Sequence, residues 1–183
     1  MKSRFILLFL GILSSGWLLD SCQQNSQPTT TTVPSNDHRG ADQEDVVLMD
    51  YGPRPTVLNI ETYTSSNNDF RNTLWTGNHL QVTLMTIPVG GEVGLEQHSG
   101  IDQFLRIEEG EGRVMMGDSR EILDFVETAG EDFAVMVPAG KWHNIVNTGN
   151  KPLKLYSIYA PAEHPHGTVH KTFQEAMDAE HLH

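Results

Sequence analysis

The sequence is poor in basic residues. Its 183 residues include 12 Lys and Arg against 24 Asp and Glu, which gives a formal net charge of −12 at pH 7. Without residues 1–21, which carry Lys2, Arg4 and Asp20, the balance becomes 10 basic against 23 acidic residues, a net charge of −13. A surface of this charge repels phosphate backbones, so nucleic-acid binding is excluded as a function class.

Long apolar runs are also lacking. Phe5–Leu13 is apolar and follows Lys2 and Arg4, but the whole apolar segment has only about 15 residues, whereas a membrane helix needs roughly 20. A short apolar core behind a positive start predicts a signal peptide over residues 1–21.

Cysteine occurs once, at Cys22, so an intramolecular disulfide is excluded. Leu19-Asp20-Ser21-Cys22 resembles the lipobox of bacterial lipoproteins, in which the cysteine is acylated and becomes the mature N-terminus. This resemblance implies a lipid-anchored protein of the bacterial cell envelope, on the periplasmic or surface side. The alternative is an exported soluble protein with an incidental cysteine.

The next segment has almost no apolar side chains. Residues 23–45 contain one Val and one Ala and nothing larger that is apolar, so they cannot bury enough surface to offset the entropy of ordering. We interpret residues 22–45 as a flexible tether and residues 46–183 as one folded domain.

Short, alternating apolar runs separated by turn residues fill most of this domain and predict an all-β sandwich or barrel. Only Ala176–Glu180, which follows a capping-box pattern at Thr172–Glu175, is predicted to be helical. The expected strands are Thr56–Tyr63, His79–Ile87, Glu92–His98, Gln103–Ile107, Gly112–Met116, Ile122–Glu127, Asp132–Val137, His143–Asn147 and Leu153–Tyr159.

Strand periodicity groups four polar side chains. Glu96 and His98 are two residues apart, so they face the same side of one strand, and Gln103 opens the next strand. His143 follows the turn Pro138-Ala139-Gly140 on another strand. A barrel that joins these strands would bring two imidazoles, a carboxylate and an amide oxygen to one interior point, a set suited to zinc, iron(II), manganese or nickel.

These residues carry a resemblance to the cupin superfamily. Gly90, Glu96, His98, Gln103 and Gly110 keep the spacing of its first motif, with glutamate in place of the first histidine and glutamine in place of the glutamate. Pro138, Gly140, His143 and Asn147 match the second motif, although its leading glycine is out of register. The resemblance covers about residues 46–178 and is closest to small bacterial cupins labelled mannose-6-phosphate-isomerase-like. It implies a double-stranded β-helix (jelly-roll) barrel with a short C-terminal helix.

The same resemblance implies a divalent metal ion as cofactor. Phosphomannose isomerases hold zinc with Gln, His, Glu and His, and this chain offers the same set with two members exchanged. His98 and His143 are the strongest donors, Glu96 follows, and Gln103 is the weakest because its amide oxygen is neutral. If Glu96 is not bound to the metal, it is the candidate catalytic base. The alternative is a metal-free pocket in which Glu96 and Gln103 are only hydrogen-bonded.

Two functions follow from this interpretation. The first is a metal-binding cupin outside the cytoplasm that binds or acts on a small polar molecule, sugar-like or with a carbonyl group, as an isomerase or oxygenase. The second is a metal-free, non-catalytic small-molecule-binding cupin. Phe104 and Arg106 are expected on the outer face, which favours a homodimer. A second metal site at His164, His166 and His170 is weakly indicated, because Pro and Gly interrupt that segment.

We predict that replacing Cys22 with Ser moves the protein from the membrane fraction to the soluble periplasmic fraction, because the acylated thiol is the anchor. Cell fractionation and intact mass of the two proteins test this. An unchanged fraction and an unchanged mass would show that Cys22 carries no lipid.

Overall fold

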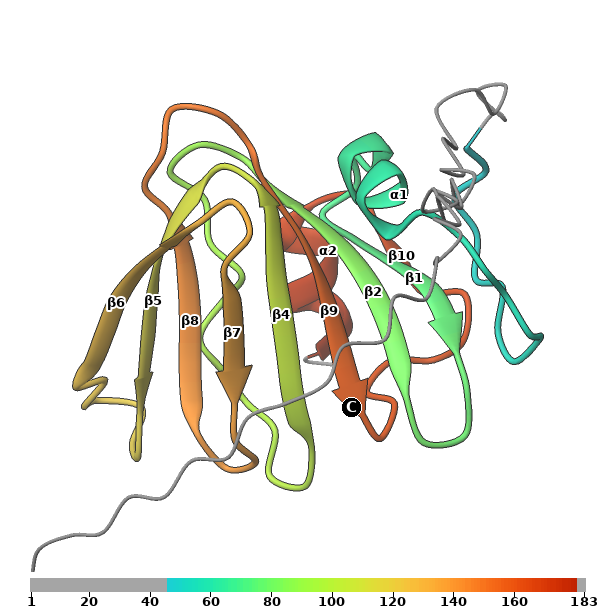
Figure 1. Cartoon of the computed structure of the whole chain (residues 1–183). Coiled ribbons are helices and arrows are strands. Elements are labelled where there is room, and N and C mark those ends of the chain that lie inside the picture. The colour runs from blue at the N-terminus through green and yellow to red at the C-terminus, as the bar shows by residue number, and fades with distance from the viewer. Residues whose placement is uncertain (1–45, 181–183) are drawn as a thin grey trace, which may run out of the picture. The chain divides into compact units, whose positions relative to one another are not determined.

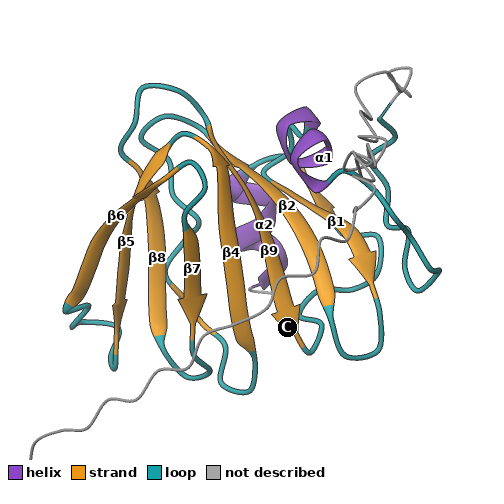
Figure 2. Cartoon of the chain, in the orientation of Figure 1, coloured by secondary structure: helices purple, strands orange, loops and turns teal. Residues whose placement is uncertain are grey.

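The computed structural model describes residues 46–180, and the predicted signal peptide, Cys22 and the tether lie outside this range. The described chain is mostly antiparallel β-structure (Figures 1 and 2). Neither helix in this part of the chain is long and apolar enough to span a membrane. In chain order the elements are α1 (Ile60–Ser66), β1 (Arg71–Thr76), β2 (Gln81–Ile87), β3 (Glu96–Gln97), β4 (Asp102–Glu109), β5 (Glu111–Gly117), β6 (Phe125–Gly130), β7 (Ala134–Val137), β8 (Trp142–Asn147), β9 (Leu153–Ala160), β10 (Val169–His170) and α2 (Phe173–Glu180).

The strands form two sheets, as a jelly roll requires. One has six strands in the order β10-β1-β2-β9-β4-β7 and the other has four in the order β3-β8-β5-β6. Figure 1 shows them as the two walls of a barrel, with α1 on the near side of the larger sheet and α2 behind it. The predicted all-β cupin architecture with a C-terminal helix is therefore confirmed.

The interior changes from apolar to polar along each central strand. On β9, Leu153 and Leu155 are fully buried and are followed on the same face by the buried Ser157 and Tyr159. The neighbouring strands change at the same level, because Tyr159 lies opposite Gln81 on β2 and Gln103 on β4. The register thus gives the barrel an apolar end, which supplies the core, and a polar end, which holds ionisable groups.

The turns of the two cupin motifs depend on glycine. Gly110 (φ 91°) and Gly140 (φ 82°) occupy the left-handed region that other residues rarely adopt. The Gly140 N–H donates to the His98 carbonyl at 2.8 Å, so this turn also fixes the end of β3. Local backbone geometry in this way places His98 next to the start of β8.

One predicted strand is wrong. Thr56–Tyr63 forms no strand, and its second half is the first turn of α1. This helix begins after Asn59, whose side chain accepts a hydrogen bond from the Thr62 N–H at 3.2 Å. An N-cap of this kind satisfies an otherwise unpaired helix donor and outweighs the β preference of the Thr, Val and Tyr side chains. The predicted strand Glu92–His98 is also too long, since only Glu96–Gln97 pairs as a strand.

Two strands, β1 and β10, were not predicted. The buried residues of β1 include Arg71, Asn72 and Thr73, so its buried face lacks the apolar alternation that marks a strand. The predicted capping box of α2 is present in shifted form. Thr172 accepts from the Glu175 N–H at 3.2 Å, while Glu175 accepts from the Lys171 N–H at 2.6 Å rather than from Thr172.

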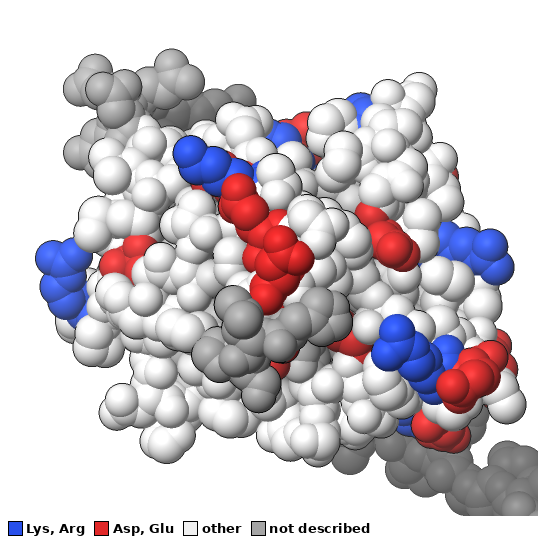
Figure 3. Space-filling view, turned by 180° about the vertical axis from the view of Figure 1, so that it is seen from behind, with Lys and Arg blue, Asp and Glu red and all other residues white. Residues whose placement is uncertain are grey.

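Charged side chains of both signs are spread over the face seen in Figure 3. Figure 3 shows basic side chains in separate places on this face, several of them beside acidic ones, and no basic patch forms there.

Candidate metal centre

Strand pairing brings together three of the four predicted site residues. Glu96 on β3 lies directly opposite His143 on β8. His98 follows β3 by one residue and is held by the Gly140 turn. One ligand atom from each of Glu96, His98 and His143 lies within 4.8 Å of the other two.

The distances in this cluster are those of a metal-type site. Glu96 Oε1 lies 3.2 Å from His98 Nε2 and 3.2 Å from His143 Nε2, and all three side chains are less than a tenth exposed. Ligand atoms about 2.05 Å from a tetrahedral zinc ion are about 3.3 Å from one another. The cluster thus needs little rearrangement to hold such an ion.

Both imidazoles are oriented through their second nitrogen. His143 Nδ1 is 3.1 Å from the Lys141 carbonyl, which can only accept, so Nδ1 donates and Nε2 is the nitrogen left for a ligand. His98 Nδ1 is 3.2 Å from Glu163 Oε1. A carboxylate or carbonyl behind each histidine is the usual support of protein metal ligands, because it fixes the ring and raises its basicity.

Electrostatics at the cluster favour a cation. Burial alone would raise the pKa of Glu96, but the contacts from His143 and His98 outweigh it and hold this pKa well below its usual range. Burial lowers the pKa of His98, but the carboxylates of Glu163 and Glu96 raise it by more than burial lowers it. The pKa of His98 is therefore raised to about 9. Two carboxylates therefore attract positive charge to one point, which either a proton on His98 or a metal ion can supply.

Gln103, the fourth predicted ligand, faces the interior but is anchored differently. It is 2% exposed, and its amide nitrogen donates to Ser157 Oγ at 2.9 Å. This bond leaves Gln103 Oε1 buried with no hydrogen-bond partner among the described residues. A fixed amide with an unpaired oxygen is the arrangement in which glutamine can act as an acceptor or a weak metal ligand.

The sequence did not reveal Arg71, Tyr159 or Glu163 around the cluster, and it indicated His164 only as part of a second metal site. Arg71 from β1 is fully buried, and its Nη2 lies 3.8 Å from Glu96 Oε2. Tyr159 packs edge-on against both His98 and His164, with ring centroids 5.5 and 5.3 Å apart. The period-two alternation of β9 could have indicated Tyr159, but nothing local marked Arg71 or Glu163.

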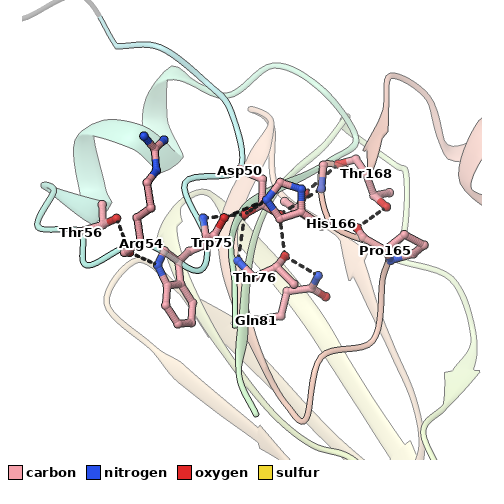
Figure 4. Close-up of polar contacts among 12 residues, drawn as sticks. Asp50, Arg54, Thr56, Trp75, Thr76, Gln81, Pro165, His166 and Thr168 are labelled. Atoms are coloured by element: carbon pink, nitrogen blue, oxygen red, sulfur yellow. Dashed lines mark hydrogen bonds and ion pairs between the residues drawn. The ribbon is translucent and has the colours of Figure 1, made fainter. Parts of the chain in front are cut away.

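Side-chain bonds fix the segment that carries Glu163 and His164. The Gln81 amide donates to the His164 carbonyl at 2.8 Å, and its oxygen accepts from the His164 and Glu163 N–H groups at 2.9 and 3.2 Å. Asp50 accepts from the Thr76 and Gly167 N–H groups at 2.9 and 3.1 Å (Figure 4). The Thr76 hydroxyl, which also donates to Asp50, and the N–H groups of Gly167 and Gly52 outweigh burial and lower the pKa of Asp50.

The weakly indicated second metal site does not form. β10 and the Gln81 bonds order this segment despite its Pro and Gly residues, but its histidines diverge. His164 and His170 line a cavity beside Arg71, whereas His166 is exposed and its Nε2 lies 3.0 Å from the Gly52 carbonyl. In the described part of the chain, the cluster able to hold a metal is Glu96, His98 and His143.

The fold and this cluster define a jelly-roll barrel protein with a metal-type site, and comparison with known proteins gives its family. The family model for the cupin domain matches residues 83–159. The chain is 55% identical over 149 residues to the uncharacterized protein YrkC of Bacillus subtilis, covering 78% of this chain and 80% of that protein. The chain belongs to the cupin family.

Two further relatives support this assignment. The crystal structure of BH2720 from Bacillus halodurans matches with a TM-score of 0.71 and 60% identity, covering 71% of this chain and 98% of that one. An uncharacterized protein of Acanthamoeba polyphaga mimivirus is 35% identical over 114 residues, covering 62% of this chain and 69% of that protein. The similarity therefore extends over nearly the whole of BH2720.

The partly buried His164 predicts an acid-dependent loss of stability. Burial, with Arg71 nearby, lowers the pKa of His164 from 6.5 to about 3, so between these pH values the unfolded chain binds one more proton than the folded one. The free energy of unfolding should fall by up to about 1.4 kcal/mol per pH unit from this group as the pH drops below 6.5.

Urea unfolding of chelator-treated protein at several pH values between 7 and 4 tests this. His164→Asn should flatten the acid limb, and His79→Asn, which changes an exposed imidazole, should leave it as in the parent. Parallel curves for the parent and His164→Asn would contradict the assignment.

Proposed function

We propose that this cupin binds one divalent metal ion through Glu96, His98 and His143, with Gln103 Oε1 as a weaker fourth ligand. The observation that carries the proposal is that both histidines have Nε2 at 3.2 Å from one carboxylate oxygen while an acceptor holds each Nδ1. A metal-free pocket, the alternative, would keep the same carboxylate paired with a protonated His98.

The donor set narrows the choice of metal. Two imidazoles and oxygen ligands without a thiolate suit zinc, iron(II), manganese or nickel, and they disfavour calcium and magnesium, which prefer all-oxygen sites. When bound, such an ion would polarise an oxygen atom of a small polar molecule in the barrel. The isomerase-like grouping that the sequence suggests stays a prediction.

Glu96 is a ligand in this proposal and not the general base. Its Oε1 is shared by the two histidines, and a carboxylate with a strongly lowered pKa is a weak proton acceptor at neutral pH. His143 and His98 would hold the ion, while the Lys141 carbonyl and Glu163 orient their rings. The chain's own residues thus divide into ligands and the groups that position them.

Metal content of purified variants tests this proposal. His98→Ala and His143→Ala should each lose most of the metal, Gln103→Ala should lose less, and Gln103→Glu should bind more tightly because it adds a carboxylate. Glu163→Gln should weaken binding by about 10- to 100-fold, as other losses of a ligand's supporting carboxylate do.

The measurements are metal stoichiometry by mass spectrometry and the rise in Tm on metal addition, which follows from mass action on the folded state. Glu127→Gln, an exposed change on β6, is the matched control for Glu163→Gln. A parent protein that stays sub-stoichiometric in zinc, iron, manganese and nickel, with no thermal shift, would favour the metal-free alternative.

We also propose that the domain lies outside the cytoplasm, where a lipid anchor holds it at the membrane, and that it forms a homodimer. The anchor is supported by the lipobox-like sequence at Cys22. The dimer is supported by apolar side chains at the edges of both sheets. Phe125 on β6, Met136 on β7 and Phe133, just before β7, are more than half exposed. Phe104 and Arg106 are half-buried on the adjoining outer face of β4, where Phe104 packs against Tyr156.

Light scattering of the domain should give about twice the monomer mass, because a second copy would cover this apolar edge. Met136→Glu should shift the mass to that of a monomer, whereas Val57→Glu, at another exposed apolar position, should not. A monomeric parent at micromolar concentration would contradict the dimer.

A further inference from the structure

A buried arginine without enough partners lies beside the metal cluster. The Arg71 side chain is 0% exposed, and its Nη1 donates to Glu180 Oε1 at 3.2 Å. Its Nη2 is 3.8 Å from Glu96 Oε2, too far for a hydrogen bond. Nε and Nη2 of Arg71 are both buried without an acceptor in the described part of the chain. A buried guanidinium whose N–H groups lack acceptors raises the free energy of the folded protein. Binding of a ligand that supplies these acceptors is therefore strongly favoured.

The unpaired atoms of Arg71 form a recognition edge. The N–H bonds of Nε and Nη2 lie in the guanidinium plane and point outward from the same edge. Such a pair of donors binds the two oxygens of a carboxylate or phosphate through parallel hydrogen bonds. Tyr159 OH, His164 Nε2 and His170 Nδ1 are likewise buried with no partner among the described residues. Burial raises the pKa of Tyr159, so its hydroxyl remains a donor at neutral pH.

A cavity of about 360 Å³ lies against Arg71, His164 and His170. It is lined by Arg71, Glu163, His164, Pro165, Thr168, His170, Ala179 and Glu180. This volume lies at the small end of ligand pockets, so it suits a compact molecule. Among these lining residues Arg71 is the one lysine or arginine, which favours a singly charged carboxylate over a doubly charged phosphate.

Glu180 already places a carboxylate on Arg71. It is the last residue of α2, whose last turn has no basic side chain, and a negative charge at a helix C-terminus is unfavourable. Its side chain is 42% exposed, in contrast to the fully buried Arg71. The Glu180 carboxylate thus lies at an electrostatically unfavourable helix end, has Arg71 as its one ion-pair partner among the described residues and can move into solvent.

We propose that Arg71 is the receptor for the carboxylate of a small organic acid, which binds the free Nε–Nη2 edge and competes with Glu180 on Nη1 for the charge of the guanidinium. The inference deepens the proposed function. Because Arg71 Nη2 lies 3.8 Å from Glu96 Oε2, the proposed ligand carries beside its carboxylate a carbonyl or hydroxyl oxygen that can face the metal cluster. The ligand class is therefore a small 2-oxo or 2-hydroxy acid.

Calorimetric titration of the full domain with pyruvate, neutral pyruvamide and inorganic phosphate tests this, in metal-free and zinc-supplemented buffer. Glu180→Gln should bind pyruvate about fivefold more tightly than the parent, since it removes a partly exposed ion pair that competes with the ligand. Asp178→Asn, the same charge change on the exposed side of α2, should match the parent. Pyruvamide should bind far more weakly than pyruvate.

Equal pyruvate affinity of the parent and Glu180→Gln in both buffers, equal binding of pyruvate and pyruvamide, or tighter binding of phosphate would each overturn the inference. Arg71→Lys keeps the positive charge but lacks the planar pair of N–H donors, so it should weaken pyruvate binding by about tenfold or more. A normal unfolding curve for Glu180→Gln keeps the test valid if Arg71→Lys does not fold.

Failure of the metal proposal gives a different result. If the parent retains no metal but Glu180→Gln still gains affinity for pyruvate, the arginine receptor stands and the metal centre does not. If zinc binds at one ion per chain and pyruvate shows no preference between the two proteins, the metal centre stands and the receptor is wrong.

Discussion

The arrangement of the barrel interior depends on the buried carboxylate of Glu96. A charge taken out of water in this way needs partners on every side, and Glu96 finds them in His98, His143 and, at a longer distance, Arg71. Each partner brings a charge or polarity that needs its own support, which Glu163, the Lys141 carbonyl and Glu180 supply. The polar end of the barrel is therefore one connected network.

Two side chains outside this network keep it in place. Gln81, on β2, holds the backbone of Glu163 and His164 with three hydrogen bonds, while Asp50 joins the N-terminal segment to the end of β1 and to Gly167. Through them the segment after β9 acts as part of the barrel wall. The cavity beside Arg71 exists because this segment is ordered, and we expect changes at Gln81 to disturb the site without touching a ligand.

Strand periodicity and motif spacing predicted the part of the site that is local in sequence. The alternation that pairs Glu96 with His98 and turns Gln103 inward is a property of any strand, and the Pro138–Gly140 turn fixes the position of His143. Arg71 was not predicted because β1 buries polar residues, so the sequence pattern of β1 does not resemble that of a strand. Glu163, and the place of His164 beside the cluster, were not predicted because side-chain bonds to Gln81, about 80 positions away, order their segment. The strand predicted over Thr56–Tyr63 was wrong because one side-chain bond, the N-cap at Asn59, decided between strand and helix.

The position of a bound metal tests the account most directly. Anomalous diffraction at the zinc absorption edge, on crystals of the domain grown with zinc, locates the ion independently of any assumed ligand. The account predicts one peak inside the barrel, about 2.0–2.2 Å from Glu96 Oε1, His98 Nε2 and His143 Nε2. A barrel without a peak, or zinc only at surface histidines such as His166, would contradict it.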